Sequence, residues 1–498
     1  MGAIKSLMKD TAIYGVSSIV GRFLNWCLVP MYTICFPVSE YGVVTYVYAV
    51  TALALIVLTY GMETGFFRFA NHDRWKDPLL VYSTSLTSLA VTSTLFCILV
   101  AVFISPVTHW MECDGHEVYV LMMALCVAVD AFTALPFSYL RYKKRPVRFA
   151  TLKLVNIGIN IGLNLFFILA CPALMKSCPG LIDWFYDPGF GIGYIFLANL
   201  IASLTMLAML WPELHGFSWR FDTRLLRQML AYSAPLLVLG VAGVLNQTIA
   251  TILYPSLVPD HAEAMEGLGI YGANYKIAIV MVMFIQAFRF AYEPFIFAEA
   301  RERGEKQLQA YRDAMKYFVL FALIIFMGVM FYLDIIKYFI SPRYFSGLKV
   351  VPVIMMAELF FGIFFNLSLW YKLTDKTVWG MYFSLLGLAV TIGLNALLVP
   401  RYGYMGCAWA AFACYAVMML ASFFVGNVRY PIHYPLGRIG AYFAVAAVLY
   451  VLGMYVLVTP AMWVNWIIRA VLLLAYMLLI VKREKIRVPS VRRPVHRA

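Results

Sequence analysis

Runs of about 20 mostly apolar residues recur along the whole chain, and each is long enough to cross a bilayer as an α-helix. Charge clusters and Pro or Gly turns separate them. We place fourteen such spans, beginning near residues 11, 41, 79, 117, 150, 190, 227, 267, 313, 346, 378, 404, 437 and 462. The composition, 63% hydrophobic and 13% charged, agrees. These runs predict an all-α polytopic membrane protein.

The basic residues are distributed unevenly between the two sides of the predicted membrane. By this placement, 31 of the 39 Lys and Arg residues lie on one side, 5 on the other and 3 inside spans. Cytoplasmic loops are enriched in Lys and Arg, so the bias places both termini in the cytoplasm. The net charge of +14 therefore reports orientation, and we expect no binding of nucleic acid.

The two halves of the chain share short sequence matches in the same order. The copies lie 221 to 231 residues apart, and loop lengths account for this variation. The matched pairs are Leu-Asn at 24–25 and 245–246, Tyr-Gly at 41–42 and 271–272, Phe-Arg-Phe-Ala at 67–70 and 288–291, and Ile-Gly-Leu-Asn at 161–164 and 392–395. Because the order is kept, we interpret spans 1–6 and 7–12 as a duplicated unit.

This duplication predicts how the chain is divided. We expect an N-terminal lobe over 1–215, a C-terminal lobe over 216–427, two added spans over 428–481 and a basic cytoplasmic tail over 482–498. Each lobe has an even number of spans, so both lobes cross the membrane in the same sense. They should be related by a pseudo-two-fold axis along the membrane normal, an architecture typical of transporters.

Several stretches resemble one transporter family. They are FPVSEYGVVTYVYA (36–49), LRQMLAYSAPLLVLGVAGVLNQ (226–247), GIYGANYKIA (269–278) and LNALLVPRYGYMGCAWA (394–410). They are similar to the polysaccharide-transport branch, with its Wzx-type O-antigen flippases, of the multidrug/oligosaccharidyl-lipid/polysaccharide exporter superfamily. Many members carry an Asp-Arg pair after the seventh span, and the segment 245–258 departs from that pattern.

The resemblance implies a V-shaped pair of six-helix lobes around a central cavity with alternating access. It also implies a function: flipping undecaprenyl-diphosphate-linked oligosaccharides for lipopolysaccharide O-antigen, capsule or exopolysaccharide across the bacterial cytoplasmic (inner) membrane. Membrane lipid and the lipid-linked glycan are the expected partners, and a polysaccharide polymerase and glycosyltransferases are further candidates. We expect no cofactor, no metal and no catalytic residue.

Two basic residues inside spans are the main candidates for binding the diphosphate. Arg22 lies in span 1 and Lys276 in span 8. A charged side chain at such a depth is costly unless it faces water or a partner, so a cavity that binds an anion explains both. Pairing with a carboxylate or with helix-end carbonyls is the structural alternative. The resemblance to the lipid II flippase, a relative with a cationic cavity, favours the substrate role.

Three amides extend this candidate site. Asn25 shares a helix face with Arg22. Asn246 and Gln247 in span 7 are the counterparts of that region in the second half, and they either line the cavity or form hydrogen bonds between helices.

Other charged residues have less specific interpretations. The duplicated Arg68 and Arg289 either contact lipid headgroups or form a cytoplasmic gate with Glu63 or Glu293. The membrane-region carboxylates Asp130 and Glu358 are candidates for coupling transport to an ion.

Other functional classes fit less well. No GxSxG, HExxH or Walker A motif and no Cys/His metal cluster is present, so we do not expect an enzyme. A major facilitator would carry a basic Gly-rich loop after span 2, which reads ANHDRWKDP here. A drug/cation antiporter of the same superfamily is the principal alternative, although basic residues inside spans suit an anionic substrate better. A passive scramblase is a further alternative, and its transport would not depend on an ion gradient.

Overall fold

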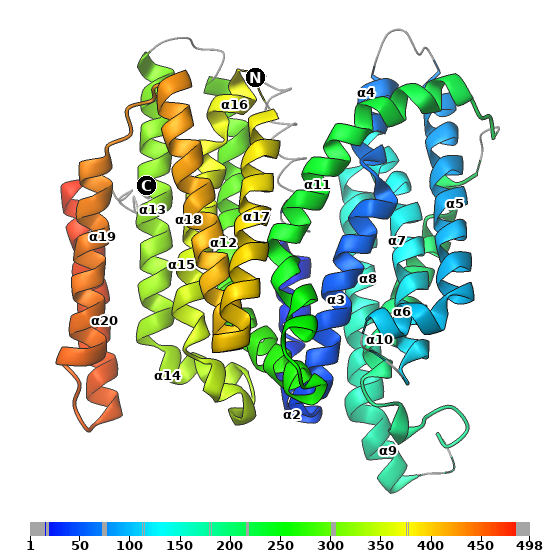
Figure 1. Ribbon diagram of the computed structural model, residues 1–498, viewed down its shortest axis with the longest axis horizontal. Helices are drawn as coiled ribbons and strands as arrows, with labels where there is room; N and C mark the ends of the chain where they lie inside the picture. The colour runs from blue at the N-terminus through cyan, green and yellow to red at the C-terminus, as the bar shows by residue number, and fades with distance from the viewer. Residues whose placement is uncertain are drawn as a thin grey trace, which may run out of the picture. The chain divides into compact units, whose positions relative to one another are not determined.

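The computed structural model describes residue 15 and residues 19–484, apart from 72–76, 112, 114, 179, 181, 216–218, 300–304, 375 and 377. In these residues all regular structure is helical. Twelve of the described helices are long and apolar enough to cross a membrane, and Ile19–Cys35 and Gly193–Met209 are shorter apolar helices. The chain is a multi-pass membrane protein, and the predicted all-α class with about fourteen spans is confirmed (Figure 1).

The chain forms two compact units, of which the first holds residues 1–295 and 339–430. Its helices are α2 (Val29–Cys35), α3 (Val38–Thr59), α4 (Met62–Ala70), α5 (Pro78–Val102), α6 (Ile104–Trp110), α7 (Glu117–Tyr142), α8 (Pro146–Leu165), α9 (Cys171–Ser177), α10 (Gly193–Met209), α11 (Thr223–Leu257), most of α12 (His261–Glu299), α15 (Val350–Leu367), α16 (Leu369–Leu373), α17 (Val378–Tyr402) and α18 (Tyr404–Arg429). The second unit, residues 296–338 and 431–498, has α13 (Glu305–Phe331), α14 (Leu333–Ile336), α19 (Leu436–Val451) and α20 (Met462–Arg483). The division at residues 215, 427 and 481 stays a prediction.

The second span is divided into α3 and α4 by two residues in the left-handed region. Tyr60 has φ 33° and Gly61 has φ 70°, and glycine adopts this conformation without steric cost. The carbonyl oxygen of Gly61 accepts from the backbone nitrogen of Gly65 in α4 at 3.0 Å and also from the hydroxyl of Ser233 in α11 at 3.3 Å. A local break in one half of the chain is thus bound by the first helix of the other half.

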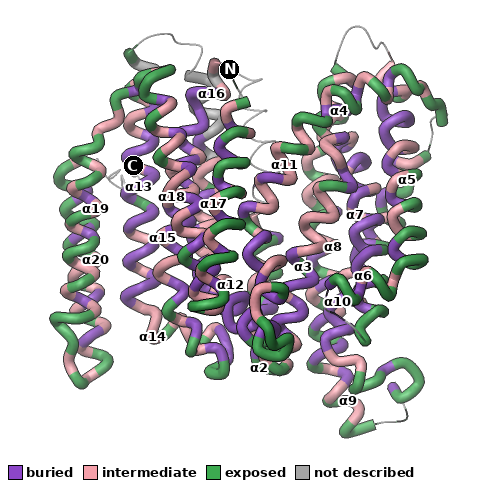
Figure 2. Tube along the Cα trace, in the orientation of Figure 1, coloured by how far each residue is buried: buried purple, intermediate pink, exposed green. Residues whose placement is uncertain are grey.

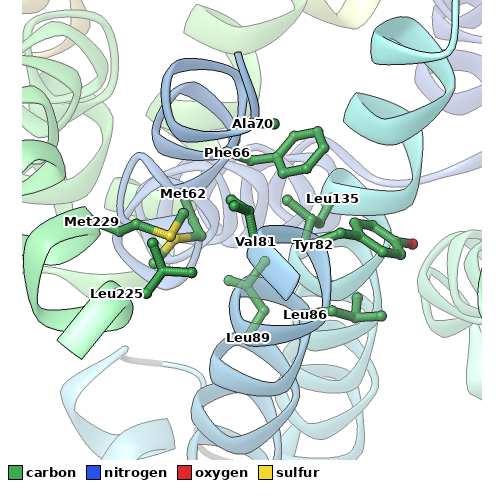
Figure 3. Close-up of a cluster of buried hydrophobic side chains, with 10 residues drawn as sticks. All are labelled: Met62, Phe66, Ala70, Val81, Tyr82, Leu86, Leu89, Leu135, Leu225 and Met229. Atoms are coloured by element: carbon green, nitrogen blue, oxygen red, sulfur yellow. The ribbon is translucent and has the colours of Figure 1, made fainter. Parts of the chain in front are cut away.

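The first turns of α11 are packed into the N-terminal half. Figure 3 shows Leu225 and Met229 of α11 beside a cluster of buried side chains. The other members come from α4, α5 and α7, and are Met62, Phe66, Ala70, Val81, Tyr82, Leu86, Leu89 and Leu135. Nearby, Asp222 caps α11 by accepting a hydrogen bond from the backbone nitrogen of Leu225 at 2.9 Å. The seventh span therefore begins among helices of the preceding repeat.

The duplicated asparagines make equivalent contacts in the two halves. Asn25 in span 1 accepts a hydrogen bond at 3.5 Å from Asn160 of α8, the fifth span of its half. Asn246 in α11 donates at 2.9 Å to the carbonyl oxygen of Ser384 in α17, the fifth span of the other half. The correspondence supports the interpretation of spans 1–6 and 7–12 as related repeats.

The helices α3 and α12 approach backbone to backbone near α2. A methyl group on Gly42 would clash with the carbonyl oxygen of Met265, and one on Gly269 would clash with that of Val38. Small residues let membrane helices approach this closely. Figure 1 shows α2 and α4 at opposite ends of the first unit, so this contact lies at the end away from α4.

Ion pairs hold the second unit together. The Arg469 guanidinium is 5% exposed and contacts the Asp334 carboxylate at 2.6 Å. It also donates to the carbonyl oxygens of Phe331 at 2.9 Å and Gly453 at 3.2 Å. Gly453 lies in a π-helical turn, Leu452–Val456, whose altered hydrogen bonding leaves that carbonyl oxygen available. This intramembrane arginine is therefore paired within the protein.

Large apolar side chains are exposed along the outer faces of several helices. Figure 2 shows many exposed residues on α5, α19 and α20. On α20 they include Trp463, Ile467, Val471, Leu474 and Leu478, each more than half exposed. In a multi-pass membrane protein such faces contact lipid, which is as apolar as these side chains.

Candidate functional site

The first span lies antiparallel to α12. At one level Gly15 lies beside Phe290, so that a methyl group on this glycine would be 3.1 Å from the phenylalanine ring. Farther along, the indole Nε1 of Trp26 donates to the carbonyl oxygen of Lys276 at 2.7 Å. The Trp26 ring also stacks on Phe339, with centroids 3.9 Å apart. These contacts fix the register between a helix of the first repeat and a helix of the second.

A cavity of about 310 Å³ lies between these two helices. Span 1 contributes Arg22, Asn25, Trp26 and Val29. The α12 side consists of Lys276, Ile279, Val282, Met283 and Gln286. The structure therefore brings together three of the five predicted binding residues: Arg22 and Asn25 of span 1, and Lys276, which lies about 250 residues later in the sequence.

The two cations in this cavity have no partner within the described part of the chain. Among the residues that the structure describes, the side chains of Arg22 and Lys276 form no hydrogen bond or ion pair. Lys276 is half-buried at the middle of the span His261–Phe290, whereas Arg22 is more open to the cavity. A cation inside a membrane span is costly unless it faces water or a partner, so the location of both side chains at one cavity is consistent with their charge.

The cavity wall formed by span 1 is held by a polar ladder on α8. Asn164 is buried, and its Nδ2 donates to Oδ1 of Asn160 at 3.0 Å. The hydroxyl of Tyr32 donates to Oδ1 of Asn164 at 2.9 Å. Asn160 in turn donates to Asn25, which also faces the cavity. This ladder positions the Asn25 amide beside Arg22.

Asn246 and Gln247 are not among the residues lining this cavity. Asn246 is 6% exposed and bonds to α17, which is the helix-pairing alternative considered above. Gln247, the next residue, is exposed. A role in substrate binding stays a prediction for both residues.

The four residues predicted to form a gate lie in different environments. The Arg68 guanidinium lies 4.2 Å from the ring centroid of Tyr232, and that of Arg289 lies 3.8 Å from the centroid of Phe365. The Glu63 carboxylate pairs with Arg141 at 2.8 Å, a partner that sequence reasoning did not identify. The side chain of Glu293 lies outside the described residues.

The two candidate ion-coupling carboxylates each have a hydroxyl donor. Ser203 donates to Oδ1 of Asp130 at 2.7 Å, in the core of the N-terminal half. Tyr275 donates to Oε1 of Glu358 at 3.1 Å, and this glutamate is 4% exposed. Tyr275 directly precedes Lys276 on α12, but neither Tyr275 nor Glu358 of α15 is among the residues lining the cavity. A coupling role for either carboxylate stays a prediction.

Gln286 lines the cavity but was not identified from the sequence. Its spacing was the available signal, because residues 276, 279, 283 and 286 fall on one face of a helix. Within the described part of the chain, no group of three His, Cys, Asp or Glu side chains could hold a metal ion.

Comparisons with known proteins agree with this architecture. A family model described as polysaccharide biosynthesis protein matches residues 7–298. No curated protein matches the chain significantly. The fold is similar to that of the lipid II flippase MurJ in an inward closed conformation, with 14% identity, coverage of 96% of this chain and 100% of that chain, and a TM-score of 0.74.

Two transporters with a similar fold support the same assignment. One is an inward-facing multidrug resistance MATE family transporter of the MOP superfamily, with 14% identity, coverage of 86% and 95%, and a TM-score of 0.66. The other is a mutant of the Vibrio cholerae MATE transporter VcmN, with 14% identity, coverage of 87% and 100%, and a TM-score of 0.56. These similarities confirm the predicted fold class.

Proposed function

Because the chain belongs to the family of polysaccharide biosynthesis proteins, we propose that it is a flippase for undecaprenyl-diphosphate-linked oligosaccharide repeat units. It moves these units, which build lipopolysaccharide O-antigen, capsule or exopolysaccharide, across the bacterial cytoplasmic membrane. The protein performs transport and catalyses no covalent step. A polysaccharide polymerase would use the flipped unit, and glycosyltransferases would supply it.

The observation that carries this proposal is a pair of cations in one cavity, neither of which has a partner among the described residues. A diphosphate must leave water to cross the bilayer, and fixed positive charges compensate for that loss. The Arg22 guanidinium provides a planar set of donors for phosphate oxygens, whereas Lys276 provides a compact charge. Asn25 adds a neutral amide beside Arg22. The polyprenyl tail stays in lipid, where it needs no polar partner.

The glycine contact between α3 and α12 gives a direction to the transport step. Positive residues assign the α4 end of the first unit to the cytoplasm, so this contact closes the opposite, outer end. The lipid-linked glycan reaches the cavity from the cytoplasmic side in this state. Opening the α3–α12 contact then exposes it to the outer side.

The remaining predicted residues take part in the change between states. Arg68 and Arg289 move away from their aromatic partners as the cytoplasmic ends of the helices move. Glu63 then exchanges its present partner, Arg141, for another arginine of the gate. Protonation or cation binding at Asp130 or Glu358 couples this change to an ion gradient. Asn246 and Gln247 contact the substrate when α11 moves.

A lipid extract tests the flippase proposal. The gene is deleted, and undecaprenyl-diphosphate-linked glycans are identified by mass spectrometry. Accumulation of a complete repeat unit, with loss of surface polymer, is expected, and the native gene should reverse both effects. Unchanged lipid intermediates and intact surface polymer, in a strain with no second flippase, would reject the proposal.

A drug/cation antiporter is the second candidate, favoured by the fold shared with MATE transporters. It would need a cavity that attracts cations, whereas the described cavity carries two positive side chains. Export of cationic dyes by cells that overproduce the protein, compared with cells lacking it, distinguishes the two functions. Dye export with unchanged lipid-linked glycans would favour the antiporter.

A further inference from the structure

One face of α12 carries the wall of the cavity from Lys276 to Gln286. Lys276, Ile279, Met283 and Gln286 follow spacings of three, four and three residues, so they lie along one helix face. The two ends of this face are polar and its middle is apolar. At a rise of 1.5 Å per residue, Gln286 lies about 15 Å from Lys276 along the helix axis.

The antiparallel register places Arg22 between these two polar ends. Gly15 lies at the level of Phe290 and Trp26 at the level of Lys276, so Arg22 lies opposite the turn that holds Val282. Along α12, that turn is about 9 Å from Lys276 and about 6 Å from Gln286. Three levels result along the cavity: Lys276, then Arg22, then Gln286 toward the Phe290 end.

The Gln286 amide is well suited to a neutral polar ligand. It is half-buried, and within the described residues it has no hydrogen-bond partner. An amide provides two donors and an acceptor, which match hydroxyl and acetamido groups. An isoprenoid chain could satisfy none of these, and a phosphate would prefer the two cations. A ligand that matches this amide is therefore a polar, uncharged group.

In a lipid-linked glycan, the group that follows the diphosphate on its polar side is the first sugar. If Arg22 and Lys276 hold the diphosphate, the next level toward the Phe290 end receives that sugar. The charge bias assigns this end to the cytoplasm, from which the glycan enters. We propose that Gln286 hydrogen-bonds the sugar attached directly to the diphosphate and so contributes to selection of the glycan. This inference rests on the proposed flippase function.

Binding of defined lipids to the purified full-length protein tests the inference. The probes are undecaprenyl diphosphate and a panel of undecaprenyl-diphosphate monosaccharides that differ in the sugar, measured by native mass spectrometry. The wild type should bind at least one monosaccharide lipid about fivefold more tightly than the bare diphosphate lipid. Gln286→Ala should lose this preference and keep its affinity for the bare lipid.

Control variants separate this role from general damage. Gln228→Ala makes the same change on α11 outside the cavity and should leave both affinities unchanged. Arg22→Ala should lower both affinities together, because both lipids carry the diphosphate.

Two results would overturn the inference while leaving the flippase proposal intact. One is a Gln286→Ala variant that keeps the full sugar preference, and the other is a wild type that binds bare and sugar-bearing lipids equally. A wild type that binds undecaprenyl diphosphate no better than undecaprenol would reject both proposals.

Discussion

Trp26 donates its indole hydrogen to the backbone carbonyl oxygen of Lys276 at 2.7 Å, and this bond joins the first span to the eighth. The same indole ring stacks on Phe339. One side chain therefore fixes the position of the α12 backbone that carries the cavity lysine. The spacing of the two cations depends on this contact.

Replacing Trp26 by Phe should remove the hydrogen bond and keep most of the ring stacking. We expect a loss of about 1 kcal/mol in stability, because this is the typical net contribution of one hydrogen bond within a protein. Thermal unfolding of the purified protein in detergent measures this effect. Trp26→Ala should cost more, since it also removes the contact with Phe339, and equal midpoints for the two variants would contradict this account.

Arg22→Ala and Lys276→Ala should each reduce flipping at least tenfold at unchanged protein level, because each removes a charge that compensates for the diphosphate. Surface polymer and accumulated lipid-linked glycan provide the measurement. Arg22→Lys and Lys276→Arg keep the charge and should retain part of the activity. Normal polymer in both alanine variants would exclude the pair as a diphosphate site.

Gly42→Ala or Gly269→Ala should separate the outer ends of α3 and α12, since the added methyl group clashes with a backbone carbonyl oxygen. A cysteine at position 45, in a chain whose nine native cysteines are replaced, reports the change. A membrane-impermeant maleimide should label it several-fold faster in either alanine variant.

Gly243→Ala is the matched control for this experiment, because a methyl group there meets no atom within 4 Å. Its labelling rate should equal that of the parent protein. Equal rates in all three alanine variants would show that the α3–α12 contact does not close the outer end.

Acid should weaken the second unit through Glu484. Burial raises the pKa of this carboxyl, but hydrogen bonds from Lys316 and Tyr442 outweigh it and hold the pKa below its usual range. The carboxylate is 2.6 Å from the Lys316 ammonium. A lowered folded-state pKa gives stability that is present above the ordinary Glu pKa of about 4.3 and lost as pH falls further.

Thermal unfolding between pH 7 and pH 3 tests this dependence. The unfolding midpoint of the wild type should stay constant down to about pH 5 and decrease at lower pH, where the unfolded state binds the proton more readily. The Glu484→Gln variant should have a lower unfolding midpoint at pH 7, and this midpoint should decrease less steeply in acid. Parallel curves for the two proteins would show that this carboxyl does not contribute.

The sequence predicted much of the fold because membrane insertion depends on local composition. An apolar run long enough to span the bilayer becomes a helix whatever its neighbours are, so fourteen spans could be counted. The bend at Tyr60 was not predicted, because its left-handed φ depends on the packing of α11 against the following glycine. Local patterns carry no information about such contacts between distant segments.

The candidate site was predicted in part for a related reason. Arg22 and Lys276 were identified because a charge within a span is costly, and this cost can be assessed from the sequence. Gln286 carries no charge, and its importance depends on the register between span 1 and α12. The pairing of Glu63 with Arg141 likewise results from tertiary packing between α4 and α7.

The packing of α11 into the preceding repeat has a consequence for the origin of this architecture. The first helix of each repeat packs against helices of the other repeat. Trp26 of the first span contacts α12, and Met229 of α11 contacts side chains of α4 and α5. A single six-span copy would leave those apolar surfaces uncovered. Two copies would bury them by exchanging their leading helices, as in a swapped dimer, and joining the copies in one gene makes that exchange permanent.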